Sequence, residues 1–195
     1  MSKLLYLIRH GTALHNDNFL KYGVKTFYDP KFKDTRLTNI GHGQSNLLNE
    51  NWNKINDIDL VLVSPLYRTL QTAENIFKGV NVPIIALEDL REYPYNSQTC
   101  NYRSNKITLE NDFPHINFNN ISVVDEKFNI KETETIESLE NRISNINKYI
   151  LNRKENTICI VSHSIFLEKM KDNKISLIEQ GEKELEHCYP YEYHI

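Results

Sequence analysis

The stretch LLYLIRHGT, residues 4–12, runs from five apolar residues (Leu4–Ile8) directly into Arg9, His10 and Gly11. A continuous apolar run of this length indicates a strand that is buried on both faces, as in a parallel sheet with helices on each side. In open sheets of this kind, ligands bind beyond the carboxyl ends of the strands. We therefore expect Arg9 and His10 to lie at a ligand-binding edge of a sheet.

Further apolar runs of similar length follow along the chain. They are Leu60–Val63, Pro83–Leu87 and Ile158–Val161, and a last strand is expected near His187–Tyr193. Amphipathic helical patterns lie between them: from Thr38, as N-cap, to Trp52; from Leu66 to Phe77; and from Ile136 to Ile150, with Thr135 as N-cap. Short strands that alternate with helices predict an α/β fold, here a three-layer α/β/α domain with a mostly parallel central sheet.

The segment from Glu92 to about Lys131 interrupts this alternation, because it is rich in Tyr, Asn, Pro and Ser and shows little periodicity. A loop of this length inside a compact domain is usually functional. We predict an irregular cap insertion over the active site, within a single domain that spans residues 1–195. Substrate specificity is then expected to depend on Tyr93–Asn129.

Composition and charge exclude several classes of protein. With 195 residues, 39% hydrophobic and 25% charged residues and a net charge of −3, the chain lacks the basic excess of a nucleic-acid-binding protein. No apolar run approaches the roughly 18 residues of a membrane span, and the run before Arg9 is too short for a secretory signal. Cys100, Cys159 and Cys188 lack the spacing of a disulfide framework or a zinc site. We expect a cytoplasmic protein without a nucleic-acid or membrane partner, and its oligomeric state stays open.

Chemically active side chains follow each of the predicted parallel strands. Ser64 follows the second strand, with Arg68 one turn into the next helix, whereas Glu92 follows the third strand and His163 the fourth. The carboxyl ends of parallel strands meet at one edge of a sheet. We therefore expect five side chains to converge there, namely Arg9, His10, Arg68, Glu92 and His163.

This set of side chains suits a phosphate monoester. Arginine stays charged at any working pH and binds phosphate oxygens through two parallel hydrogen bonds. A neutral histidine can attack phosphorus and become a phosphohistidine, and a carboxylic acid can protonate the leaving oxygen and later activate water. Since two arginines and a second histidine would stabilise the charge on the transferred group, the chemistry needs neither a metal ion nor another cofactor.

The motifs at these strand ends resemble those of the histidine phosphatase superfamily, also called the phosphoglycerate mutase-like fold. The matching residues are Arg9-His10-Gly11, Ser64-Pro65 with Arg68-Thr69 and Gln71-Thr72-Ala73, and Ser162-His163. Other residues are similar to the phosphoglycerate mutase-like proteins of plants and fungi: Asp29-Pro30, Leu37-Thr38 with Gly41 and Gln44, Leu90-Arg91-Glu92, Cys100-Asn101 with Arg103, and Phe113-Pro114 with Ile116 and Phe118.

The resemblance implies a phosphorylated nucleophile, four phosphate-binding residues and an acid: His10, then Arg9, Arg68, His163 and Asn16, then Glu92. Two more residues are candidates for binding the substrate, Thr12 beside the nucleophile and Arg103 on the substrate side of the pocket. The expected partner is a small phosphorylated substrate.

The chain also departs from its relatives. Phosphoglycerate mutases carry paired arginines after the acid, which hold the substrate carboxylate, and none follow Glu92 here. In the acid-phosphatase branch an aspartate follows the second histidine, whereas Ser164 follows His163. Glu92 must therefore supply the acid, with Glu88 and Asp89 as nearby competitors.

The predicted function is a metal-independent phosphomonoesterase that acts through a phosphohistidine on a small phosphorylated metabolite. A phosphoglycerate mutase, a phosphoprotein phosphatase and a non-catalytic phosphate-binding module remain as alternatives. The absence of paired arginines argues against the mutase, and the presence of both a nucleophile and an acid argues against the binding module. The other histidines are expected to be structural or exposed: His15, His42, His115, His187 and His194.

Overall fold

A computed structural model of the protein describes residues 2–128, 131–175 and 184–195. Within these residues the chain forms one sheet with the strand order β3-β2-β4-β1-β5. The strands are β1 (Leu4–Arg9), β2 (Leu60–Val63), β3 (Ile84–Ala86), β4 (Thr157–Ser162) and β5 (Tyr191–His194). The first four are mutually parallel, and β5 runs antiparallel to β1 at the edge. The prediction of a mostly parallel central sheet is confirmed.

The register of the sheet brings the carboxyl ends of its central strands to one edge. Arg9 at the end of β1 pairs with Ser162 at the end of β4. Val63, the last residue of β2, pairs with Val161 of β4 and with Ala86 of β3. The residues that follow these strands therefore lie side by side.

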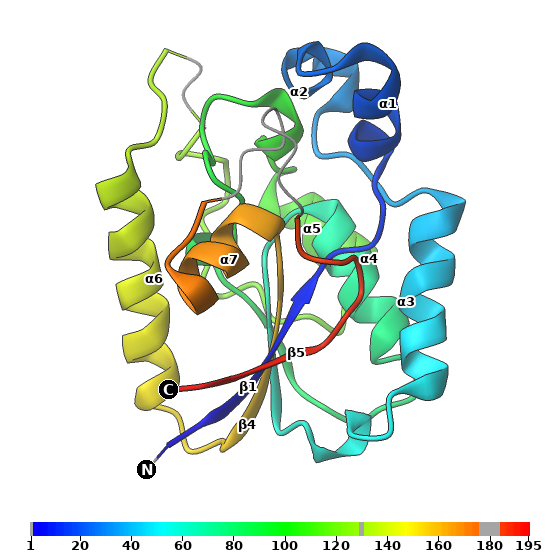
Figure 1. Ribbon diagram of the computed structural model, residues 1–195, viewed down its shortest axis with the longest axis vertical. Coiled ribbons are helices and arrows are strands. Elements are labelled where there is room, and N and C mark those ends of the chain that lie inside the picture. Colours follow the sequence, from blue (N-terminus) through cyan, green and yellow to red (C-terminus); the bar gives the residue numbers. More distant parts are fainter. Residues whose placement is uncertain (1, 129–130, 176–183) are drawn as a thin grey trace.

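Helices cover both faces of the sheet (Figure 1). On one face lie α3 (Asn39–Asn51) and α4 (Tyr67–Ile76), and on the other lie α6 (Ile136–Leu151) and α7 (Ser164–Asp172). The alternation of side chains along β1 serves both layers, because Tyr6 and Ile8 join one hydrophobic cluster and Leu5 and Leu7 join the other. This arrangement is the predicted three-layer α/β/α architecture.

Three shorter helices lie outside these layers or at their margin. They are α1 (Leu14–Tyr22), α2 (Lys25–Tyr28) and α5 (Lys106–Asp112), and 3-10 turns occupy Pro30–Phe32, Ile55–Asp57, Glu88–Leu90 and Thr99–Asn101. Helices α1 and α2 stand beyond the carboxyl ends of the strands, beside the first part of the insertion (Figure 1). Phe19 and Leu20 of α1 and Phe27 of α2 line a cavity there.

Several sequence-based boundaries are confirmed. The Thr38 hydroxyl accepts a hydrogen bond from Gly41 N, and the Thr135 hydroxyl accepts one from Ser138 N, so both residues cap their helices as expected. The last strand starts at Tyr191 rather than near His187. The expected end of the insertion near Lys131 adjoins residues 129–130, which lie outside the described residues.

The insertion is more than a cap. Its second half sends buried side chains into the core between the sheet and the layer of α3 and α4, among them Leu109, Phe113 and Phe118. Asn117 also pairs with β3, because its N–H donates to Ile84 O and its carbonyl accepts from Ala86 N. Only the first half, around Cys100 and Asn101, reaches the carboxyl edge.

Candidate active site

His10 lies buried at the carboxyl edge of the sheet, next to two of its predicted partners. Its ring centroid is 5.1 Å from that of His163, and its Nε2 is 3.2 Å from Nε of Arg68. Arg9 precedes it on β1. The structure thus brings the predicted nucleophile, one arginine and the second histidine into direct contact.

The hydrogen bonds of His10 assign its tautomer. Nδ1 lies 2.7 Å from the carbonyl oxygen of Gly11, which can only accept, so Nδ1 carries the proton. Nε2 carries the lone pair, which accepts a hydrogen bond from Arg68 Nε in this structure and would have to leave that bond to attack phosphorus. Burial, and then the charge of Arg68, hold the pKa of His10 well below its usual value. The imidazole is therefore neutral and can act as a nucleophile.

The turn that carries His10 is clamped against the start of α3. A Cβ atom on Gly11 would lie 2.6 Å from the carbonyl oxygen of Gly41, and a Cβ atom on Gly41 would overlap the carbonyl oxygen of Thr12. Gly11 N also donates to Oγ1 of Thr72 at 3.0 Å. Both positions require glycine because two backbone segments touch there.

Arg68 is held by the insertion and by the first turn of α4. Its Nη1 donates to the Cys100 carbonyl and its Nη2 to Asn101 Oδ1, both at 2.8 Å. At the start of α4, the buried carboxylate of Asp34 accepts from Tyr67 N at 2.9 Å and from Ser104 N at 2.6 Å. A guanidinium has five N–H donors, so Arg68 retains two for a ligand.

Arg9 is partly engaged by a segment that sequence reasoning did not connect to it. Its Nη2 forms an ion pair with Glu184 Oε2 at 2.9 Å, and its Nη1 donates to the Leu185 carbonyl at 2.8 Å. Its Nε is buried and has no hydrogen-bond partner within the described part of the chain.

His163 stands between Ser64 and the site. Its Nε2 lies 2.8 Å from Ser64 Oγ, and its Nδ1 is buried without a partner. Burial, and then the charge of Arg68, lower its pKa well below the usual value. The Ser64 hydroxyl can donate to Nε2 or accept from it, so Nδ1 is an unsatisfied donor in the first case and an unsatisfied acceptor in the second.

Glu92 is half-buried beside the start of α7. Its Oε1 accepts from Tyr93 N at 2.8 Å and from Phe166 N at 3.2 Å. Burial raises the pKa of Glu92 to about 7, despite these bonds and the charge of Arg68, which oppose the rise. The two competing acids are engaged elsewhere, since Glu88 pairs with Arg103 and Asp89 accepts from Asn145.

Thr12 and Asn16 lie beside the nucleophile, and each forms a hydrogen bond that holds the local backbone. Thr12 N donates to Gln44 Oε1 at 2.8 Å, and Asn16 Oδ1 accepts from Ala13 N at 2.9 Å. Both residues, together with Arg9 and His187, line a cavity of about 230 Å³.

Arg103 is not brought to the site. Its guanidinium is buried and donates to Glu88, just before the insertion, and to Ser104, Ser122 and Val124 within it. This geometry gives Arg103 a structural role in holding the insertion together, so we leave it out of the proposed site.

Two histidines that were expected to be structural or exposed border the nucleophile. The ring centroid of His187 is 5.6 Å from that of His10, and its Nδ1 donates to the His10 carbonyl. Burial, and then the charge of Arg9, lower the pKa of His187 to about 4. His15 is buried, with its ring centroid 6.1 Å from that of His10 and its Nδ1 2.6 Å from Thr35 Oγ1.

The direction of β5 explains why His187 reaches the nucleophile. Because β5 is antiparallel, the residues that precede it arrive at the edge where β1 ends. An apolar run does not reveal its direction, so the sequence alone could not place His187 at this edge. The other three histidines are remote: His42 contacts Asn75, His115 pairs with Glu74, and His194 lies on β5.

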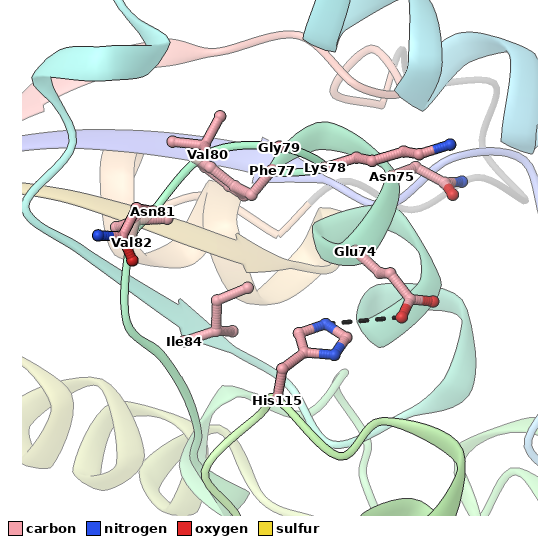
Figure 2. Close-up of a pocket in the computed structure, with 10 residues that line it drawn as sticks. All are labelled: Glu74, Asn75, Phe77, Lys78, Gly79, Val80, Asn81, Val82, Ile84 and His115. Atoms are coloured by element: carbon pink, nitrogen blue, oxygen red, sulfur yellow. Dashed lines mark ion pairs between the residues drawn. The ribbon is translucent and has the colours of Figure 1, made fainter.

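A larger cavity of about 700 Å³ lies away from His10, between the end of α4 and the start of β3. Figure 2 shows its lining, in which His115 and Glu74 form an ion pair with 3.5 Å between Nε2 and Oε1. Since α4 starts at the active site and runs away from it, this cavity opens near the opposite edge of the sheet. It contains none of the predicted site residues.

The arrangement of the described residues also bears on metal binding and on membrane insertion. No group of three or more His, Cys, Asp or Glu side chains among them is arranged to hold a metal ion. No helix in the described ranges is both long and apolar enough to cross a membrane.

Known plant proteins are similar to this chain over most of its length. Two curated Arabidopsis thaliana proteins are similar over 85% of this chain: phosphoglycerate mutase-like protein 1, 29% identical over 69% of its own length, and a phosphoglycerate mutase-like protein, 28% identical over 72% of its length.

Solved structures share the fold. The ecdysone phosphate phosphatase from Bombix mori, in complex with tungstate, covers 96% of this chain and 87% of its own, with a TM-score of 0.65 and 16% identity. The α-ribazole phosphatase from Shigella flexneri covers 95% and 87%, with a TM-score of 0.60 and 20% identity. The model of the histidine phosphatase superfamily (branch 1) matches residues 5–170. The chain therefore belongs to the histidine phosphatase superfamily, as its strand-end motifs predicted.

Proposed function

We propose that this protein is a phosphomonoesterase in which His10 takes the phosphoryl group from a small phosphorylated metabolite and passes it to water without a metal ion. Family membership supports phosphatase chemistry. The names of similar proteins include both phosphoglycerate mutase-like proteins and phosphatases, so they do not by themselves choose between transfer to substrate and transfer to water.

The observation that carries the proposal is a pair of unpaired nitrogen atoms on side chains next to His10. Arg9 Nε and His163 Nδ1 are buried and have no hydrogen-bond partner among the described residues. Folded proteins rarely leave buried polar groups unpaired, and a bound ligand is one way to satisfy them. A phosphate oxygen would accept from Arg9 Nε, and from His163 Nδ1 in the tautomer that carries its proton there, and would bring phosphorus close to His10.

The same residues account for both chemical steps. Nε2 of His10 would form a bond to phosphorus while the bond from phosphorus to the ester oxygen breaks, and Glu92 would protonate the departing alcohol. The ionised Glu92 would then take a proton from water as its oxygen attacks phosphorus and the P–N bond breaks. Phosphate leaves, and His10 and Glu92 return to their starting forms. Arg9, Arg68 and His163 would stabilise the charge on the transferred group.

The size of the site favours a small substrate over a phosphoprotein. The cavity beside His10 has a volume of about 230 Å³ and is bounded by α1 and α2. Typical sites for drug-sized ligands have volumes of roughly 300–1,000 Å³, so this one is suited to a metabolite.

The test is phosphate release from a panel of phosphomonoesters in the presence of EDTA. Wild-type protein should release phosphate, and His10→Ala should lower kcat by roughly 10⁴-fold or more, as loss of a nucleophile does. His115→Ala, in the cavity away from His10, is the matched control and should keep wild-type turnover.

The outcomes separate the alternatives. Wild-type turnover by His10→Ala would refute the proposal. Bisphosphate-dependent isomerisation without net phosphate release would identify a mutase, and phosphate binding without turnover of any ester would identify a binding module.

A further inference from the structure

The cavity beside His10 has one polar and one apolar side. Arg9, Thr12 and His187 form the polar side and connect it to the nucleophile. The apolar part of the lining consists of Phe19 and Leu20 of α1 and Phe27 of α2. A phosphate bound at Arg9 would therefore have an apolar wall next to the position of its ester group.

The apolar wall is ordered and continuous with the catalytic centre. The rings of Phe19 and Phe27 are stacked, with centroids 5.1 Å apart and planes at 5°. Phe27 meets His15 edge-on at 6.0 Å, and the ring of His15 lies 6.1 Å from that of His10. Both phenylalanines are only half-buried, so they have apolar surface left to cover.

The charges around the cavity oppose an anionic ester group. Asp17 and Glu184 both contribute to the lining. Among the described lining residues Arg9 is the cationic side chain, and it already forms an ion pair with Glu184. A carboxylate on the substrate would meet like charge, and the described part of the lining offers it no second cation.

From this juxtaposition we infer that the alcohol part of the substrate is small and apolar, a single ring or short hydrocarbon chain that packs on Phe19 and Phe27, and that it carries no carboxylate. This inference rests on the proposed phosphomonoesterase function. It places specificity in α1 and α2, whereas the sequence led us to expect it in Tyr93–Asn129, of which Asn129 lies outside the described residues.

The inference can be tested with esters whose alcohols have similar leaving ability. We would compare 2-phenylethyl phosphate with glycerol 1-phosphate and 3-phosphoglycerate, all esters of primary alcohols. We expect kcat/KM to be highest for 2-phenylethyl phosphate and lowest for 3-phosphoglycerate, with at least about a tenfold step between the apolar ester and glycerol 1-phosphate.

Variants of the wall assign the preference to its residues. Phe19→Ala and Phe27→Leu should each lower kcat/KM for 2-phenylethyl phosphate about tenfold and change that for glycerol 1-phosphate less than about twofold. Asp17→Asn should raise kcat/KM for 3-phosphoglycerate only. Leu14→Ala is the control, because Leu14 is an exposed residue of α1 outside the cavity lining. Thermal unfolding of each variant checks that the fold is retained.

Each outcome has a distinct meaning. Equal or better turnover of 3-phosphoglycerate by the wild type, or an equal loss for both neutral esters in the Phe19 and Phe27 variants, would overturn the inference while leaving the phosphomonoesterase intact. No His10-dependent phosphate release from any ester would instead refute the proposed function on which the inference rests.

Discussion

At His10 and Glu92, burial acts on two ionisable groups with opposite results. It removes the charge from the histidine by lowering its pKa, and it keeps a proton on the glutamate by raising its pKa to about 7. A neutral nucleophile and a protonated acid can therefore coexist near neutral pH. Paired groups whose pKa values are shifted in this way mark acid–base assignments in enzymes.

The first prediction concerns Glu92 and pH. Because the acid must be protonated, kcat/KM for 2-phenylethyl phosphate should fall about tenfold per pH unit above the pKa of about 7. The substrate is already a dianion there, since the second pKa of a phosphate monoester is about 6. The decrease in kcat/KM therefore reflects ionisation of a group on the protein. Glu92→Gln should abolish this decrease of kcat/KM with pH and lower kcat roughly 10²–10⁴-fold.

The control for this prediction is p-nitrophenyl phosphate, whose leaving group needs no proton. Glu92→Gln should slow its hydrolysis far less than that of the alkyl ester. An equal loss for both esters would show that Glu92 does not donate the proton. Asp89→Asn, at the competing acid whose carboxylate accepts an exposed hydrogen bond from Asn145, should leave both rates close to those of the wild type.

At the scale of elements, the active-site turn depends on how closely α3 approaches it. The contact of Gly11 with Gly41 leaves no room for a side chain at either position. Gly43, two residues further along the same helix, has open space around its Cβ position. These two glycines of α3 therefore form a matched pair for experiment.

The second prediction uses that pair. Gly41→Ala should destabilise the protein by about 1–3 kcal/mol, because its methyl group would press on the backbone of Thr12. It should also lower kcat, since the turn that carries His10 must shift. Gly43→Ala should stabilise the protein by up to about 1 kcal/mol, as alanine favours a helix interior more than glycine does. Urea unfolding and phosphatase assays would measure both effects; equal stability of the two variants would contradict the clamp.

The elements differ in how well the sequence predicts them, for physical reasons. Strands β1, β2 and β4 are buried on both faces and appear as continuous apolar runs. Helices α4 and α6 each bury a full stripe of side chains, and α3 and α6 have a threonine cap. Helix α1 could not be predicted in this way, because Ala13 provides no side-chain cap and Leu14 and Leu20 are exposed.

On the scale of the whole molecule, the insertion is tied to the domain by buried charges as well as by apolar packing. Arg91 forms an ion pair with the buried carboxylate of Asp125 at 2.7 Å, and Arg103 forms one with Glu88 at 2.5 Å. Buried charges need such partners, because an unpaired one is costly. The insertion is thus part of the folded core and should not open as a separate unit.

The third prediction tests whether the insertion unfolds together with the rest of the domain. Phe118→Ala should lower the free energy of unfolding by about 3–5 kcal/mol, as for other buried phenylalanines, and unfolding should remain a single transition by fluorescence and circular dichroism. Val123→Ala, an exposed position of the same segment, should change stability by less than about 0.5 kcal/mol. Two separate transitions in either protein would show that the insertion unfolds independently.

Sequence patterns predict only those active-site residues that follow the parallel strands. His10, Arg68 and His163 follow apolar runs whose carboxyl ends must meet, so their convergence was predictable. Glu184 and His187 arrive through an antiparallel strand, and Cys100 and Asn101 through the insertion. Their contacts with the site depend on chain direction and loop shape, which local patterns do not contain.

The pairing of β1 with β5 has a practical consequence for handling the protein. Lys3 N donates to the Ile195 carbonyl at 2.8 Å, and Ile195 N donates to the Lys3 carbonyl at 3.2 Å. These residues adjoin the start of β1, and at about 3.3 Å per residue the strand places His10 roughly 20 Å away at its other end. A surface tether or affinity tag attached at either terminus would therefore leave the cavity facing bulk solution, so immobilised protein should remain open to its substrate.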